Sequence, residues 1–158
     1  MALSRAAKTV DPKVPFLRSL PSFSGVRDRD LASLASLFDE VRLEAGEPLI
    51  REGEPGHELF LMVEGLALVS LREEALATVG AGEFVGEMAL LERAPCSATV
   101  TALTPVRALV AGAQSFGSLL AHPEVMRSLT IGLVRRLRAS QRSPGGWHKG
   151  TRDTAVGA

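Results

Sequence analysis

The apolar and polar positions of this chain alternate with two different periods, which divide it into helical ends and a central region of strands. Near the beginning, four apolar residues follow the spacing i, i+3, i+4 and i+7: Leu31, Leu34, Ala35 and Phe38. This spacing is typical of an amphipathic helix. We expect that helix to begin near Asp28, where acidic residues suit the first turn, and to end near Asp39 or Glu40.

The central region contains short apolar or alternating runs that are separated by glycine and proline turns. We expect strands at 41–43, 49–50, 59–63, 66–71, 76–79, 98–103 and 106–110. The run Leu59–Val63 is continuously apolar, which indicates a strand buried on both sides or in a sandwich core. Regularly spaced short strands with helices outside them predict an α+β fold, an antiparallel β jelly roll with N-terminal helices and a long C-terminal helix.

The last predicted helix runs from Pro123 to about Gln141, and Pro123 and Glu124 form a favourable first turn. Its apolar surface is wider than a single stripe. Either one face packs on the sheets and a second meets a partner helix, or the whole surface belongs to the core. The domain organisation that we predict is a flexible tail at 1–15, one domain at 16–142 and a disordered tail at 143–158.

Composition excludes several classes of protein. The chain has 18 Lys and Arg against 18 Asp and Glu, so it carries no overall basic field for nucleic acid. Cys96 is the only cysteine, which excludes an intrachain disulfide and suits a reducing cytoplasm. No apolar run approaches the roughly 20 residues of a membrane span, and the N-terminus lacks the apolar core of a signal peptide. We therefore expect a cytoplasmic protein without a membrane segment.

The sequence shows no constellation of catalytic or metal-binding residues. His57, His122 and His148 lack the spacing of metal ligands, and the single cysteine adds none. There is no phosphate loop for nucleotide hydrolysis and no nucleophile elbow. We expect no enzymatic activity, no metal and no cofactor.

The most informative stretch is 82–100. Gly82 and Gly86 bracket Phe84, Glu87 and a very short apolar run follow, and Pro95 precedes a β-branched strand. This pattern predicts a loop, one helical turn and a loop back into a strand. The free N–H groups at the start of such a turn can hold an anion. Gly86 would let the backbone approach a ligand closely, and Glu87 can accept hydrogen bonds from ligand hydroxyls such as those of a ribose.

These residues resemble the phosphate-binding cassette of cyclic-nucleotide-binding domains, which occur in catabolite-activator-type transcription factors, kinase regulatory subunits and some ion channels. The residues in pattern are Phe84, Gly86, Glu87, Ala89, Leu90, Pro95, Ser97, Ala98, Thr99 and Val100. The resemblance covers about 16–141 and implies an eight-stranded jelly roll. The main departure from the family's pattern is Cys96, which stands where the family carries its phosphate-binding arginine.

The resemblance implies a ligand, cyclic AMP (cAMP) or cyclic GMP (cGMP), and a set of binding residues. That set is Gly86, Glu87, Met88, Ala89, Cys96, Ser97, Arg136 and Ser140. By analogy with the family, Ser97 rather than threonine favours adenine over guanine, and Ser140 would offer its hydroxyl to the adenine amino group. The alternatives are that Glu87 is only a helix-start or surface carboxylate and that Ser140 is an exposed helix serine. Arg136 either pairs with Glu87 or is one of several solvated arginines.

Cys96 decides how much of this chemistry remains. A thiol cannot make the charged, bidentate contact of a guanidinium, and hydrogen bonds to charged groups contribute roughly 1.5–3 kcal/mol each. Arg93, three residues earlier, is a candidate substitute. The thiol itself is either an inert, partly buried group or a redox sensor near a helix start.

Two functional hypotheses follow. The first is a stand-alone regulatory module that senses a cyclic nucleotide, cAMP rather than cGMP, and signals through its C-terminal helix to a protein partner. The second is a degenerate module that has lost its ligand and serves as a dimerisation or protein-interaction scaffold. The resemblance also implies a homodimer through the last helix. The residues after that helix are fewer than the roughly 40 that a self-stable domain needs, so we expect no direct DNA binding.

Overall fold

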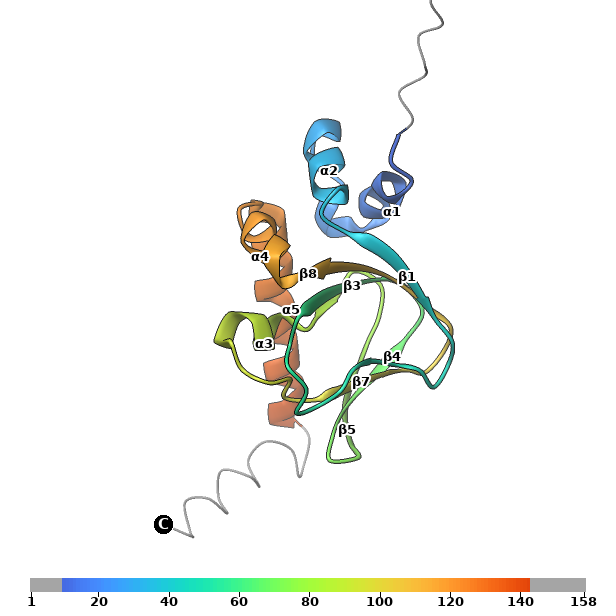
Figure 1. The fold of residues 1–158 in the computed structure, drawn as a ribbon, viewed down its shortest axis with the longest axis vertical. Helices are drawn as coiled ribbons and strands as arrows, with labels where there is room; N and C mark the ends of the chain where they lie inside the picture. The colour runs from blue at the N-terminus through green and yellow to red at the C-terminus, as the bar shows by residue number, and fades with distance from the viewer. Residues whose placement is uncertain (1–9, 143–158) are drawn as a thin grey trace, which may run out of the picture.

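Two four-stranded antiparallel sheets form the centre of the protein, and helices cover one of them (Figure 1). The computed structural model describes residues 10–142. Sheet A has the order β1 (Asp39–Leu43), β8 (Val106–Gly112), β3 (Glu58–Glu64), β6 (Phe84–Val85). Sheet B has the order β2 (Pro48–Ile50), β7 (Thr99–Ala102), β4 (Ala67–Leu71), β5 (Glu74–Val79). The predicted antiparallel jelly roll is confirmed.

The helices lie before, within and after the strands in the chain. They are α1 (Lys13–Ser19), the 3₁₀ helix η1 (Pro21–Phe23), α2 (Asp28–Ala35), α3 (Glu87–Glu92), α4 (Ala113–Leu120) and α5 (Pro123–Arg142). Figure 1 shows α1 and α2 together beyond β1 and β8, and α5 running alongside the sheets past α3. Within residues 10–142, no helix combines the length and the apolar character that crossing a bilayer would require.

Strand β3 explains why the core has two parts. Leu59, Leu61 and Val63 belong to the apolar cluster that sheet A forms with the helices. Phe60 and Met62 belong to a second cluster, which lies between the two sheets. Successive side chains of a strand point to opposite faces, so a strand covered on both sides needs an unbroken apolar run. The continuous run at 59–63 is therefore buried on both faces, as the sequence predicted.

Three expectations about the elements were wrong in detail. The predicted flexible tail at 1–15 already contains the start of α1 at Lys13, and Val14 is buried there. Pro15 fits because its position lies in the first turn, where an N–H would have no partner inside the helix. Helix α2 ends at Ala35 rather than near Glu40; the chain turns at Ser36 and Leu37, and Phe38, directly after this turn, is buried in the core. The third difference is β6, whose two residues are too few to show an alternating pattern.

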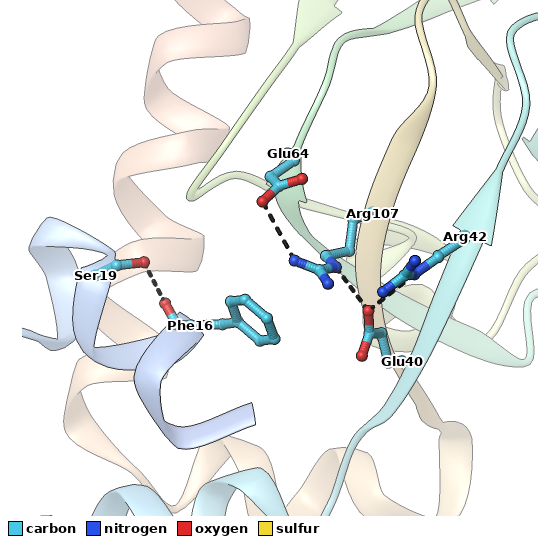
Figure 2. Close-up of polar contacts among 6 residues, drawn as sticks. All are labelled: Phe16, Ser19, Glu40, Arg42, Glu64 and Arg107. Carbon is cyan, nitrogen blue, oxygen red and sulfur yellow. Dashed lines mark hydrogen bonds and ion pairs between the residues drawn. The ribbon is translucent and has the colours of Figure 1, made fainter. Parts of the chain in front are cut away.

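The N-terminal helix α1 is attached to sheet A by a small polar cluster (Figure 2). Arg107 of β8 donates from Nε to Glu40 at 2.6 Å and from Nη1 to Glu64 at 3.3 Å. The same guanidinium lies over the ring of Phe16 in α1, 4.3 Å from its centroid. A cation over an aromatic face is attracted by the ring's quadrupole. One side chain of β8 therefore ties β1, β3 and α1 together.

Candidate functional site

The stretch singled out in the sequence folds into a compact connection between the two sheets. Strand β6 of sheet A leads into Gly86, whose φ is 95°, and α3 begins at Glu87. Helix α3 ends at Glu92, and its C-cap residue Arg93 is also left-handed, with φ 52°. Pro95 then forms a bridge with Pro55 before the chain enters β7 of sheet B. The predicted short helix and the loop from it into a strand are confirmed, whereas the loop expected before the helix contains β6.

Gly86 is required by the packing of the protein itself. A Cβ added at Gly86 would lie 2.5 Å from the carbonyl oxygen of Glu58 in β3 and 3.3 Å from a methyl of Ile50. Its positive φ is also costly for any residue with a side chain. We had expected the glycine to make room for a ligand; the structure supplies a different reason, the close approach of α3 to the β3 backbone.

Glu87 is the one buried charged residue in the part of the chain that the structure describes. Its side chain is fully buried, and its Oε1 accepts a hydrogen bond from Nη2 of Arg136. Arg136 lies on α5, 49 residues away in the sequence. Its Nη2 also donates to the carbonyl of Phe84 at 3.1 Å, and its Nε donates to the carbonyl of Gly132 at 3.4 Å. The cassette and the last helix are therefore joined through one guanidinium.

The second carboxylate oxygen of Glu87 has a different environment. Oε2 is buried and has no hydrogen-bond partner among the described residues. A buried polar atom without a partner costs roughly 1–3 kcal/mol, so such atoms are rare in native proteins. The arrangement leaves one oxygen held by Arg136 and the other able to accept a hydrogen bond from a bound hydroxyl.

For each of these two residues the structure excludes one of the alternatives that the sequence left open. Glu87 is neither a surface carboxylate nor solvated, and Arg136 is partly buried and paired with it. Whether they contact a ligand stays a prediction. The signal in the sequence for Arg136 was weak, because four arginines lie close together at the end of α5 and only the packing of that helix selects one.

Cys96 lies against apolar groups and against the loop between β2 and β3. Its side chain packs on the apolar cluster between the sheets. Its N–H donates to the carbonyl of Glu54 at 2.9 Å, and its carbonyl accepts from the N–H of Gly53 at 2.9 Å. Burial, and secondarily the nearby Glu54 carboxylate, raise the pKa of the Cys96 thiol above its ordinary value. This is the environment of an inert thiol rather than of an activated one.

The raised pKa predicts slow alkylation of Cys96. The thiolate is the reactive species, so a higher pKa leaves less of it at pH 8. We measure the rate of reaction with iodoacetamide at a series of pH values. The pH at which this rate reaches half its maximum should be higher for Cys96 in the native protein than for the same cysteine in urea-unfolded protein. Glu54→Gln removes one cause of the shift and should move the native midpoint downward. A native midpoint at or below the unfolded one would show that the thiol is activated.

The side chains of the remaining predicted ligand residues differ in exposure. Ala89 is buried. Its Cβ packs against Gly56, and a Cβ added to Gly56 would lie only 2.3 Å from it. Met88 and Ser97 are exposed. The side chain of Ser140 lies outside the described residues, as does the predicted tail at 143–158. The sequence did not indicate that position 56 requires a glycine, because the requirement comes from a contact with Ala89, which is distant in the sequence.

A cavity of about 620 Å³ lies beside α3, and Ala89 of the predicted ligand set is part of its lining. Its lining includes Arg93 and Leu90 of the cassette, Phe116 of α4, and the loop residues Pro55 and His57. Glu87, Cys96 and Arg136 do not line it. Arg93, the candidate substitute for the missing arginine, therefore lines a cavity that Glu87 and Cys96 do not line.

Comparison with known proteins identifies the family. A family model described as the cyclic nucleotide-binding domain matches residues 40–122. The cAMP-dependent protein kinase regulatory subunit of Hypocrea atroviridis is 32% identical over 123 residues, which are 78% of this chain and 25% of that protein. The chain thus spans about a quarter of the length of this relative.

Solved structures agree. The N-terminal domain of a transcriptional regulator from Streptomyces coelicolor A3(2) is 37% identical, with a TM-score of 0.58 over 78% of this chain and 92% of that one. The regulatory subunit of a cAMP-independent protein kinase A from Trypanosoma cruzi, bound to guanosine, is 25% identical, with a TM-score of 0.63 over 71% of this chain and 41% of that one. The fold, the cassette and these matches together show that the chain belongs to the cyclic-nucleotide-binding domain family.

Proposed function

We propose that this chain is a regulatory module that binds a ribose-bearing ligand of the cyclic-nucleotide class at Glu87 and signals through α5 to a protein partner. The observation that carries the proposal is the buried Glu87 carboxylate, with Oε1 on Arg136 and Oε2 without a partner among residues 10–142. A ribose hydroxyl would donate the missing hydrogen bond. A hydrogen bond to a charged acceptor in a water-excluded position contributes roughly 1.5–3 kcal/mol.

The route of the signal follows from Arg136. Its guanidinium contacts Glu87 of α3, the carbonyl of Phe84 in β6 and the carbonyl of Gly132 in α5. A ligand that binds the free oxygen of Glu87 changes the charge distribution that Arg136 experiences. If the ligand interacts more strongly with one position of α5 than with another, its binding shifts the population of molecules toward that position.

The names of the relatives guide the choice of ligand. The regulatory subunit from Hypocrea atroviridis is cAMP-dependent by name, and the Trypanosoma cruzi subunit is described as bound to guanosine. Both ligands carry a ribose, which is the part that Glu87 would hold. Among cyclic nucleotides we expect cAMP rather than cGMP, on the family analogy at Ser97.

Titration calorimetry with cAMP, cGMP and adenosine tests the proposal. We expect at least one of them to bind with sub-millimolar affinity and Glu87→Gln to weaken that binding about tenfold or more, because a neutral amide is a poorer acceptor for a hydroxyl. Glu92→Gln removes an exposed carboxylate from the same helix and should leave the affinity unchanged. Absence of heat with all three ligands at millimolar concentration would reject the proposal.

The scaffold alternative is favoured by one observation, the packing of Cys96 into the apolar cluster between the sheets. Helix α5 offers a surface for association, since Met126, Ile131 and Val134 are each 40–44% exposed while Val125 and Leu129 are buried. We propose that this exposed apolar face joins two copies of the chain, whichever of the two functions holds. Sedimentation equilibrium measures it directly, and a monomer mass at high micromolar concentration would exclude the dimer.

A further inference from the structure

The charges around the candidate ligand site are unevenly distributed. Glu87 contributes a buried negative charge, and Glu54 lies beside Cys96 in the approach to β7. Arg136, the cation that contacts Glu87, is already paired with that carboxylate. Among residues 10–142, Glu54 has no ion-pair partner.

The Cys96 end of the site has little to offer an anion. The Cys96 N–H is used by the carbonyl of Glu54, and the thiol packs on apolar side chains. A Cβ on Gly56 would lie 3.5 Å from Sγ, so the thiol is directed against the β2–β3 loop. The pKa of this thiol, raised by burial and by Glu54, agrees with surroundings that disfavour negative charge. Arg93 lines a cavity whose lining includes neither Cys96 nor Glu87.

Ribose hydroxyls and a cyclic phosphate therefore meet opposite conditions. A hydroxyl finds an unpartnered, buried acceptor in Glu87 Oε2. A phosphate brings a permanent negative charge near the unpaired Glu54. It must give up water where Cys96 offers no guanidinium and where Arg136 is already held by Glu87. We propose that the site prefers an uncharged ribonucleoside to the corresponding cyclic phosphate. This inference rests on the ribose contact at Glu87 in the proposed function and changes the preferred ligand from the cyclic nucleotide to its nucleoside.

Three adenine ligands test the inference in wild-type protein by titration calorimetry at low ionic strength. Adenosine carries the ribose hydroxyls without a phosphate, cAMP adds the cyclic phosphate, and 2′,3′-dideoxyadenosine lacks both hydroxyls. We expect adenosine to bind about tenfold or more tightly than cAMP, and the dideoxy compound to bind about tenfold more weakly than adenosine. Added salt should strengthen cAMP binding, because it screens the repulsion, and leave adenosine binding nearly unchanged.

Two variants test the charge explanation. Cys96→Arg supplies a guanidinium at the phosphate end and should shift the ratio of the two affinities toward cAMP about tenfold or more. Glu54→Gln, at an exposed position, removes a negative charge without entering the core and should shift the ratio in the same direction by a smaller factor. The Glu54→Gln variant still tests the charge explanation if the larger side chain of Cys96→Arg prevents folding.

The outcomes separate this inference from the proposed function. If cAMP binds wild type as tightly as adenosine or more tightly, and Glu87→Gln abolishes that binding, the nucleoside preference is wrong and the ribose site stands. If adenosine is preferred but neither variant changes the ratio, the charge explanation is wrong. If none of the ligands binds, both the proposed function and this inference fail.

Discussion

Replacing Arg136 with alanine is expected to lower the free energy of unfolding by about 3 to 5 kcal/mol, because it leaves the fully buried carboxylate of Glu87 without its cation. Breaking a buried ion pair from one side is far more costly than losing a surface pair. Urea denaturation followed by circular dichroism measures the change. Arg135→Ala removes the neighbouring, exposed arginine of the same helix and should change stability by no more than about 0.5 kcal/mol.

The loss on Arg136→Ala should depend on the charge of Glu87. In a Glu87→Gln background the buried group is neutral, so the arginine deletion should cost at least about 1 kcal/mol less than in wild type. A double-mutant cycle over the two positions gives this difference. If Arg136→Ala is as mild as Arg135→Ala, or if the two losses simply add, the two residues do not form the buried pair.

Gly86→Ala is expected to destabilise the protein by about 2 to 5 kcal/mol, through two effects at one position. The left-handed backbone, with φ 95°, costs a residue with a Cβ roughly 1–2 kcal/mol. The added Cβ would also meet the Glu58 carbonyl oxygen at 2.5 Å, and relieving such overpacking costs roughly 1–3 kcal/mol more. Because the contact is with backbone, β3 and α3 must move apart. Thermal or urea unfolding measures the sum.

Gly46→Ala is the matched control for the backbone effect. Gly46 has nearly the same φ, 91°, but an added Cβ would meet nothing within 4 Å. We therefore expect a loss of about 1 to 2 kcal/mol there, from the left-handed conformation alone. The difference between the two variants is the contribution of the α3–β3 contact. Equal losses would mean that β3 yields easily and that Gly86 is needed only for its φ.

The predictions for Arg136 and for Gly86 concern neighbouring contacts at the start of α3. Gly86 sets the distance between α3 and β3, and the next residue, Glu87, is held by Arg136 from α5. A ligand at Glu87 would therefore act on a position where the sheet, the cassette and the last helix meet. This is the physical basis on which the proposed signal through α5 rests.

Much of the fold was predictable because it depends on local patterns. The apolar run at 59–63 indicated a strand covered on both sides, and the glycine and proline turns separated the strands that surround it. The spacing of the cassette placed a short helix at Glu87. The prediction failed where a residue's place depends on distant contacts. Phe38 fits a helical stripe but enters the core from a turn, and Phe84 pairs with Leu61 in a strand of only two residues.

The candidate site divides in the same way. By itself the sequence determined the family resemblance, the short helix that carries Glu87, and the absence of an arginine at position 96. Only the tertiary structure decided which arginine of α5 pairs with Glu87 and that Oε2 has no partner among the described residues. It also decided that Arg93 lines a cavity that Glu87 does not line. The physical reason is that residue types and short-range spacing are properties of the chain, whereas burial, ion pairing and the direction of a side chain arise when segments far apart in sequence pack together.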